Sequence, residues 1–178
     1  METFDPITAS RAVLIEVANV LGAFREHFVV VGGWVPELLY PNLGHMGSID
    51  VDLAVAPTAL AGNAYETIRK RMIDAGYINQ TGPTRFLKTV AGVVDPVKVD
   101  VISGQYAQGE KSAAILVNEL ALSSLRGIDL AFEAHDEIEI SGPMPDGECR
   151  PRPDCAARNF HSDQGICAGR KDQAEGRI

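Results

Sequence analysis

The chain has 178 residues, of which 46% are hydrophobic, and this is enough for one domain with a sizeable core. Its formal net charge of −8 at pH 7 argues against a broad nucleic-acid-binding surface, although it permits a local basic groove. No apolar run reaches the ~20 residues that a membrane-spanning helix needs, and the N-terminus lacks the apolar segment of a signal peptide. We therefore expect a cytoplasmic protein that does not associate with membranes.

The first predicted element is a helix. Asp5 is a favourable N-cap, and Pro6 suits the first helical position because its missing N–H costs little there. Apolar residues then recur at helical spacing. The pattern predicts a helix from Pro6 to Glu26 with its apolar side in the core.

A strand and a glycine turn follow. Phe28 to Val31 is typical of a strand, and Gly32-Gly33 ends it. Glycine lets a ligand approach the main chain, and a glycine turn leading into a helix points free N–H groups at an anion. Pro36 suits the first turn of such a helix. Trp34 either packs under the turn or stacks on a base, and packing is the commoner role of a single tryptophan.

The next predicted strand, Ile49 to Val55, carries two acids on one face. Strand side chains alternate between faces, so Asp50 and Asp52 point the same way, about 7 Å apart at their Cα atoms. The opposite face is aliphatic and is expected to pack on the core through Ile49, Val51, Leu53 and Val55. Two neighbouring carboxylates repel each other, and a hard divalent cation such as Mg²⁺ would relieve that repulsion.

A second helix is predicted from about 59 to 75, with Gly76 as its C-terminal stop. Its expected core residues are Ile68, Met72 and Ile73. Strands are predicted over 77–80, 84–90 and 97–102. In the last of these, Lys98 and Asp100 lie opposite an aliphatic face made by Val97, Val99 and Val101. The chain therefore presents a third acid in the same setting as the first two.

The C-terminal part is harder to assign. Residues 113–140 are ambiguous between helix and strand, and Ile138 to Ile140 is the last predicted strand. After Gly142 the hydrophobic periodicity ends, so we expect a catalytic domain over 1–143 and an irregular tail over 144–178. The tail holds all three cysteines, whose spacing matches no zinc pattern: Cys149, Cys155 and Cys167.

The glycine pair, the Asp50-x-Asp52 strand and Asp100, in this order, resemble the nucleotidyltransferase superfamily related to DNA polymerase β. Within it, the likeness is to the AbiEii/AbiGii-type nucleotidyltransferases, the toxin half of some toxin–antitoxin pairs. The resemblance covers roughly residues 10 to 142. The chain departs from the family in having Gly33 where many members have serine, and in a longer spacing between the turn and the acids.

The resemblance implies an α/β fold with a mixed, mainly antiparallel sheet flanked by helices. It implies that Asp50, Asp52 and Asp100 bind two Mg²⁺ (or Mn²⁺) ions and carry the catalysis. The expected nucleotide-binding residues are Gly32, Gly33, Ser48, Arg85 and Lys98, with Lys88 as a further candidate cation. The reaction would move a nucleoside monophosphate from a nucleoside triphosphate to a hydroxyl of RNA, tRNA or protein. An antitoxin protein would be a partner.

Two other functions are compatible with the same residues. One is a non-catalytic remnant of such an enzyme that binds a nucleotide or a protein. The other is an enzyme that uses the acids for metal-dependent hydrolysis. A dinucleotide-binding Rossmann domain is disfavoured because no G-x-G-x-x-G follows the first strand.

The tail itself carries a separate expectation. Charge balance, cysteine use and periodicity all change after about Gly142. Read one nucleotide later, codons for the last eight residues permit a Lys-Asp-Ala-Tyr sequence, which is similar to a helical motif of these nucleotidyltransferases. We therefore expect a frameshift that replaces a helical domain, and weak or absent turnover in the chain as it stands.

Overall fold

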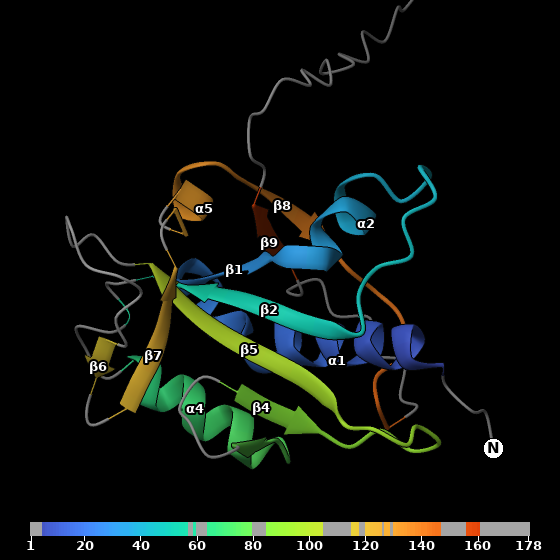
Figure 1. Cartoon of the computed structure of the whole chain (residues 1–178), viewed down its shortest axis with the longest axis horizontal. Helices are drawn as coiled ribbons and strands as arrows, with labels where there is room; N and C mark the ends of the chain where they lie inside the picture. Colours follow the sequence, from blue (N-terminus) through green and yellow to red (C-terminus); the bar gives the residue numbers. More distant parts are fainter. Residues whose placement is uncertain are drawn as a thin grey trace, which may run out of the picture.

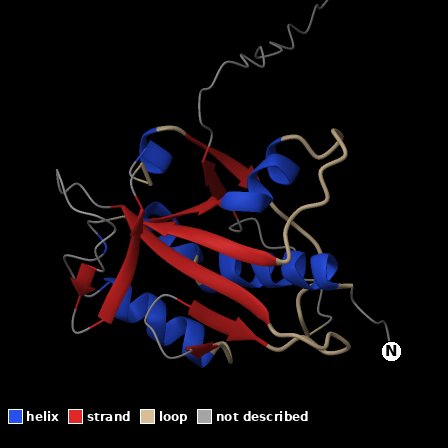
Figure 2. Ribbon diagram, in the orientation of Figure 1, coloured by secondary structure: helices blue, strands red, loops and turns tan. Residues whose placement is uncertain are grey.

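The structure is a computed structural model, and it describes most of the chain in segments: residues 5–56, 59, 64–79, 85–104, 115–117, 120–125, 127–128, 130–146 and 156–160. The predicted α/β class is confirmed, because helices surround a mixed, mostly antiparallel sheet (Figure 1, Figure 2). None of the helices in these segments combines the length and apolar character needed to span a bilayer.

The strands of the sheet lie in the order β3-β4-β5-β2-β1-β9-β8, and β7 pairs with both β5 and β6. The central pair is β2 (Asp50–Val55) and β5 (Val97–Gly104), which run parallel. On either side, β1 (Phe28–Val31) pairs antiparallel with β2, and β4 (Arg85–Lys88) pairs antiparallel with β5. The short β3 (Ile78–Asn79) lies beyond β4.

Helix α1 (Pro6–Val20) packs across one face of β2 and β5 (Figure 1). Its start is as predicted, because Asp5 Oδ1 accepts hydrogen bonds from the N–H groups of Ile7 at 2.9 Å and Thr8 at 3.0 Å. The single helix predicted as far as Glu26 is wrong at its end. The α-helix stops at Val20 and a 3-10 segment, η1 (Gly22–His27), follows, in which the dihedral angles leave the helical region at Phe24.

The core lies between α1 and the sheet. The predicted alternation of aliphatic and polar side chains in the two central strands is confirmed, because the aliphatic face of each strand is buried. The buried strand residues are Val51, Leu53, Val55, Val97, Val99 and Val101. Ile49 was expected to belong to this face, but the strand begins at Asp50 and the Ile49 residue is 61% exposed.

Helix α4 (Ala64–Asp74) also contacts α1. Gly76 ends it as predicted, with a φ of +83°, and its N–H donates to Ile73 O at 2.9 Å. Ile68 and Met72 are buried, whereas Ile73 is exposed because adjacent helical positions point about 100° apart. The first residues of the predicted helix, apart from Ala59, lie outside the described segments.

The ambiguous C-terminal region contains strands and one short helix. They are β6 (Ile115–Val117), β7 (Leu120–Leu125), α5 (Leu130–Glu133) and β8 (His135–Glu139). The predicted irregular tail contains one further strand, β9 (Ala156–Phe160), which pairs parallel with β1 and antiparallel with β8. The remainder of the tail after residue 146 lies outside the described segments, and the frameshift stays a prediction.

Candidate metal and phosphate site

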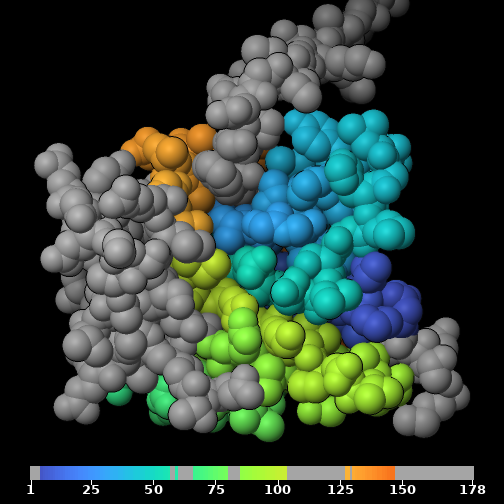
Figure 3. Space-filling model, viewed as in Figure 1, coloured from blue at the N-terminus to red at the C-terminus, as the bar shows by residue number. Residues whose placement is uncertain are grey.

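The parallel register of β2 and β5 brings the three predicted acids onto one face of the sheet. Asp52 lies opposite Asp100, and Asp50 lies opposite Lys98. Residues opposite each other in neighbouring strands share a face, about 4.8 Å apart across the ladder. Because the valines between these acids face α1, the carboxylates point away from the core. Figure 3 shows that residues of the two strand regions, cyan and yellow-green, adjoin on the face turned toward the viewer.

Asp52 is a partly buried acid beside two others. Its partial burial, and then the neighbouring charges of Asp50 and Asp100, raise its pKa from 3.8 to about 6, against an opposing effect of Arg85. Burial disfavours a charged carboxylate, and nearby negative charge does the same. A cation bound beside Asp52 would favour its charged form.

Asp100 is already paired with a cation. Arg85 lies opposite it in the β4–β5 register, and the guanidinium contacts both carboxylate oxygens. The Nε atom donates to Oδ1 at 2.6 Å, and a terminal nitrogen donates to Oδ2 at 2.7 Å. The Asp100 side chain is 19% exposed and that of Arg85 is 45% exposed, so the pair sits at the edge of the site with its cation toward solvent.

Asp50 is oriented by a hydroxyl group. Ser48 Oγ donates to Asp50 Oδ1 at 2.6 Å. The same serine lies against the glycine turn, because a Cβ atom placed on Gly33 would come within 2.9 Å of Ser48 Cβ. Sequence reasoning assigned Ser48 to nucleotide binding. Its hydrogen bond to Asp50 could not be predicted from the alternation of the strand. The serine links the turn to the first acid of the strand.

The glycine turn and the second acid are in closer contact still. Gly32 has a φ of +74°, and a Cβ atom there would lie 2.2 Å from Asp52 Oδ2. Only glycine fits, both for its backbone conformation and for the space. The turn continues as η2 (Gly32–Trp34) and α2 (Val35–Leu39). The backbone of the turn therefore lies directly beside the acids, as the predicted arrangement of phosphate and metal requires.

Trp34 packs under the turn and is not available for stacking. It is 1% exposed, and its indole N–H donates to Ser10 Oγ at 3.1 Å. A Cβ atom on Gly47 would meet the Trp34 ring at 2.5 Å, so the loop before β2 lies tightly against the indole. Of the two roles considered for this tryptophan, the structural one is confirmed, and it fixes the turn relative to the acid strand.

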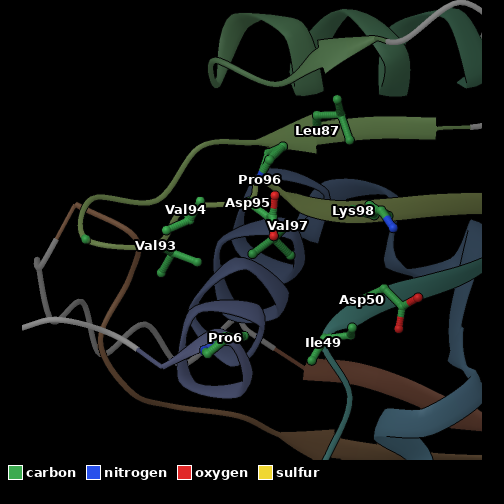
Figure 4. Close-up of a pocket in the computed structure, with 11 residues that line it drawn as sticks. Pro6, Ile49, Asp50, Leu87, Val93, Val94, Asp95, Pro96, Val97 and Lys98 are labelled. Carbon is green, nitrogen blue, oxygen red and sulfur yellow. The ribbon is translucent and has the colours of Figure 1, made fainter.

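Lys98 lies at the edge of an open pocket of about 730 Å³ beside Asp50 (Figure 4). The loop between β4 and β5 forms its far side with Val93, Val94 and Asp95. Two of its apolar residues are strongly exposed, Ile49 at 61% and Val94 at 98%. Isolated exposed aliphatic residues are common, but here they line a cavity next to the acids.

Lys88 is not part of the site. Its ammonium group pairs with Glu16, donates to Ala75 O at 2.7 Å and lies 4.7 Å from the centre of the Tyr77 ring. Strand parity explains this, because Lys88 lies three positions after Arg85 and therefore on the other face of β4. Period two in the sequence could have excluded it, had the face of Arg85 been known.

Within the described segments, no group of three His, Cys, Asp or Glu side chains is arranged so that it could hold a metal ion. Asp50 and Asp52 provide the hard oxygen donors that Mg²⁺ favours, while Arg85 engages the third carboxylate. Comparison with protein-family models, curated proteins and solved structures found no match to the chain.

Proposed function

We propose that this chain is a metal-dependent nucleotidyltransferase that moves a nucleoside monophosphate from a nucleoside triphosphate to an acceptor hydroxyl. The observation that carries the proposal is the shared face of the central strands: Asp50 and Asp52 on β2 and Asp100 on β5, with the backbone of Gly32 against Asp52. Acids for a cation and a glycine turn whose backbone would bind phosphate then lie within one small site.

The acids fit Mg²⁺ or Mn²⁺ because Asp50 and Asp52 present carboxylate oxygens on one face of β2, next to Asp100 on β5. Asp50 and Asp52 would hold the metal, and Ser48 would keep the Asp50 carboxylate in its orientation. Divalent ions in such a site stabilise the attacking and leaving oxygens of an in-line displacement at phosphorus. Asp100 supplies the third carboxylate on the side nearest β4.

The order of the strands suggests how the substrates would lie. The glycine turn at the end of β1 would bind the leaving phosphates through its N–H groups. In-line displacement requires the acceptor to enter from the side opposite the leaving group. That side is occupied by β5 and β4, where Lys98 and the open pocket lie next to Asp50. We therefore assign the pocket to the acceptor, whose reacting group would be a hydroxyl of RNA, tRNA or protein. An antitoxin protein would cover the same face of the molecule.

One contact favours a second candidate, a non-catalytic nucleotide-binding or protein-binding remnant. Arg85 neutralises Asp100 through two hydrogen bonds, and a module that never loads a second metal would be stable in that state. The two candidates differ in turnover and agree on metal-dependent binding of a triphosphate at Asp50 and Asp52.

Label transfer distinguishes them. The purified chain is incubated with each α-labelled nucleoside triphosphate, Mg²⁺ and either total RNA or protein substrates. We expect transfer that is weak, requires Mg²⁺ and falls to background in Asp52→Asn, while Asp136→Asn, which changes an exposed acid on β8, has no effect. Transfer that is equal in the wild type and Asp52→Asn would contradict the proposal, and binding without transfer would favour the remnant.

A further inference from the structure

We infer that Arg85 is the resident counter-cation of the site, and that its guanidinium must leave Asp100 before a metal ion can use that carboxylate. Loading of the metal and release of Arg85 are then a single exchange. The inference rests on the proposed function, and it assigns to Arg85 control over metal affinity in place of simple phosphate binding.

The geometry of the pair is the first step. A guanidinium that contacts both oxygens of a carboxylate occupies the side of it that a metal would approach. A metal held by Asp52 and Asp100 would also lie near the positive charge of Arg85, because Asp52 and Arg85 flank Asp100 from the two neighbouring strands. Geometry and charge therefore both oppose a metal while the ion pair is closed.

The second step is that Arg85 can move while its strand stays in place. The next residue, Phe86, is 1% exposed and anchors β4 in the core. The Arg85 side chain points to the other face and is 45% exposed. The ion pair can open without unfolding, because the partly exposed guanidinium can exchange its hydrogen bonds with Asp100 for hydrogen bonds with water.

The third step concerns charge. One guanidinium faces three carboxylates on this side of the sheet, because Asp50, Asp52 and Asp100 share the face on which Arg85 lies. A divalent ion brings more charge and would satisfy Asp52 and Asp100 together, which one guanidinium on Asp100 does not do. The ion pair therefore holds Asp100 in place without removing the electrostatic reason for binding a metal.

The test is the affinity for Mn²⁺ alone, measured by electron paramagnetic resonance on the purified chain. Arg85→Gln removes the cation, and Arg85→Lys keeps the charge but loses the bidentate contact with Asp100. Lys70→Gln, which removes an exposed cation on α4, is the control. We expect the Kd for Mn²⁺ to fall about tenfold in Arg85→Gln, to fall by less in Arg85→Lys and to stay unchanged in Lys70→Gln.

Two results would overturn the inference: an Arg85→Gln variant that is folded by circular dichroism and binds Mn²⁺ no more tightly than the wild type, or an Arg85→Lys variant equal to the wild type. The second would mean that charge alone, and not the contact on Asp100, opposes the metal. The tighter Mn²⁺ binding of Arg85→Gln must also depend on Asp100, so adding Asp100→Asn to Arg85→Gln should abolish the increase in affinity.

The outcome separates this inference from the proposed function. If Mn²⁺ binds equally to the wild type and Arg85→Gln and is lost in Asp52→Asn, the metal site stands and only the exchange fails. If neither protein binds Mn²⁺, the proposed function fails and the exchange with it.

Discussion

Replacing Asp52 by asparagine should stabilise the protein while removing its metal site. The folded state raises the pKa of this carboxyl from 3.8 to about 6, so the charged form is less favourable in the fold than in the unfolded chain. The difference is about two pKa units, which would correspond to ~3 kcal/mol at 1.36 kcal/mol per unit for a fully buried group, and solvent screening of this half-buried carboxyl reduces it to about 1–2 kcal/mol. Asparagine has nearly the same shape and carries no charge. We therefore expect Asp52→Asn to raise the free energy of unfolding at pH 7 by up to this amount.

The sign of the pH dependence follows from the direction of the shift. Below pH ~4 the carboxyl is protonated in both states, so wild type and Asp52→Asn should unfold with similar free energies. As pH rises from ~4 to ~6, the unfolded chain loses its proton first and the wild type loses stability relative to the variant. Urea denaturation between pH 3.5 and 8, with Asp136→Asn as an exposed control, measures the difference. A pH-independent difference, or a less stable Asp52→Asn at pH 7, would refute the reasoning.

Three further predictions concern the surroundings of the site. Lys88→Met leaves the carboxylate of Glu16 poorly exposed and without its cation, so urea denaturation should show a loss of about 3 kcal/mol, largely restored by adding Glu16→Gln. Gly32→Ala forces a side chain into the acid site at a positive φ, so calorimetry should show loss of Mg²⁺–triphosphate binding, and retained affinity would mean that the turn is only structural. Ile49→Glu should lower label transfer to the acceptor severalfold, whereas Leu43→Glu, which changes an exposed residue that does not line the pocket, should not; equal effects would contradict the assignment of the pocket to the acceptor.

Local patterns predicted the parts of the site that depend on a single strand. Alternation along β2 identified Asp50 and Asp52 as neighbours on one face, and Val51 between them is buried. The same reasoning placed Asp100 opposite an aliphatic face. Period two determines which face a side chain occupies, and this requires no knowledge of the neighbouring strands.

Features that depend on pairing between distant segments were not predictable in the same way. The sequence does not specify that Asp100 lies beside Asp52, or that Arg85 lies opposite Asp100, because register is set by the packing of whole strands. The strand β9 was missed for a related reason: Ala156–Phe160 shows no alternation, and it pairs because an edge of β1 is available to it. Lys88 was named as a candidate cation of the site because the orientation of β4 was unknown, and the structure places it on the other face of that strand.

The most direct test of the central claim is calorimetry of a Mg²⁺–nucleoside triphosphate complex with the wild type and with the Asp50→Asn/Asp52→Asn double variant. We predict binding to the wild type that requires Mg²⁺, and no detectable binding to the double variant. The double variant should remain folded and should unfold with a free energy no lower than that of the wild type, since it removes repelling charges. Equal affinity of the two proteins for the Mg²⁺–triphosphate complex would contradict the assignment of these acids to a metal site.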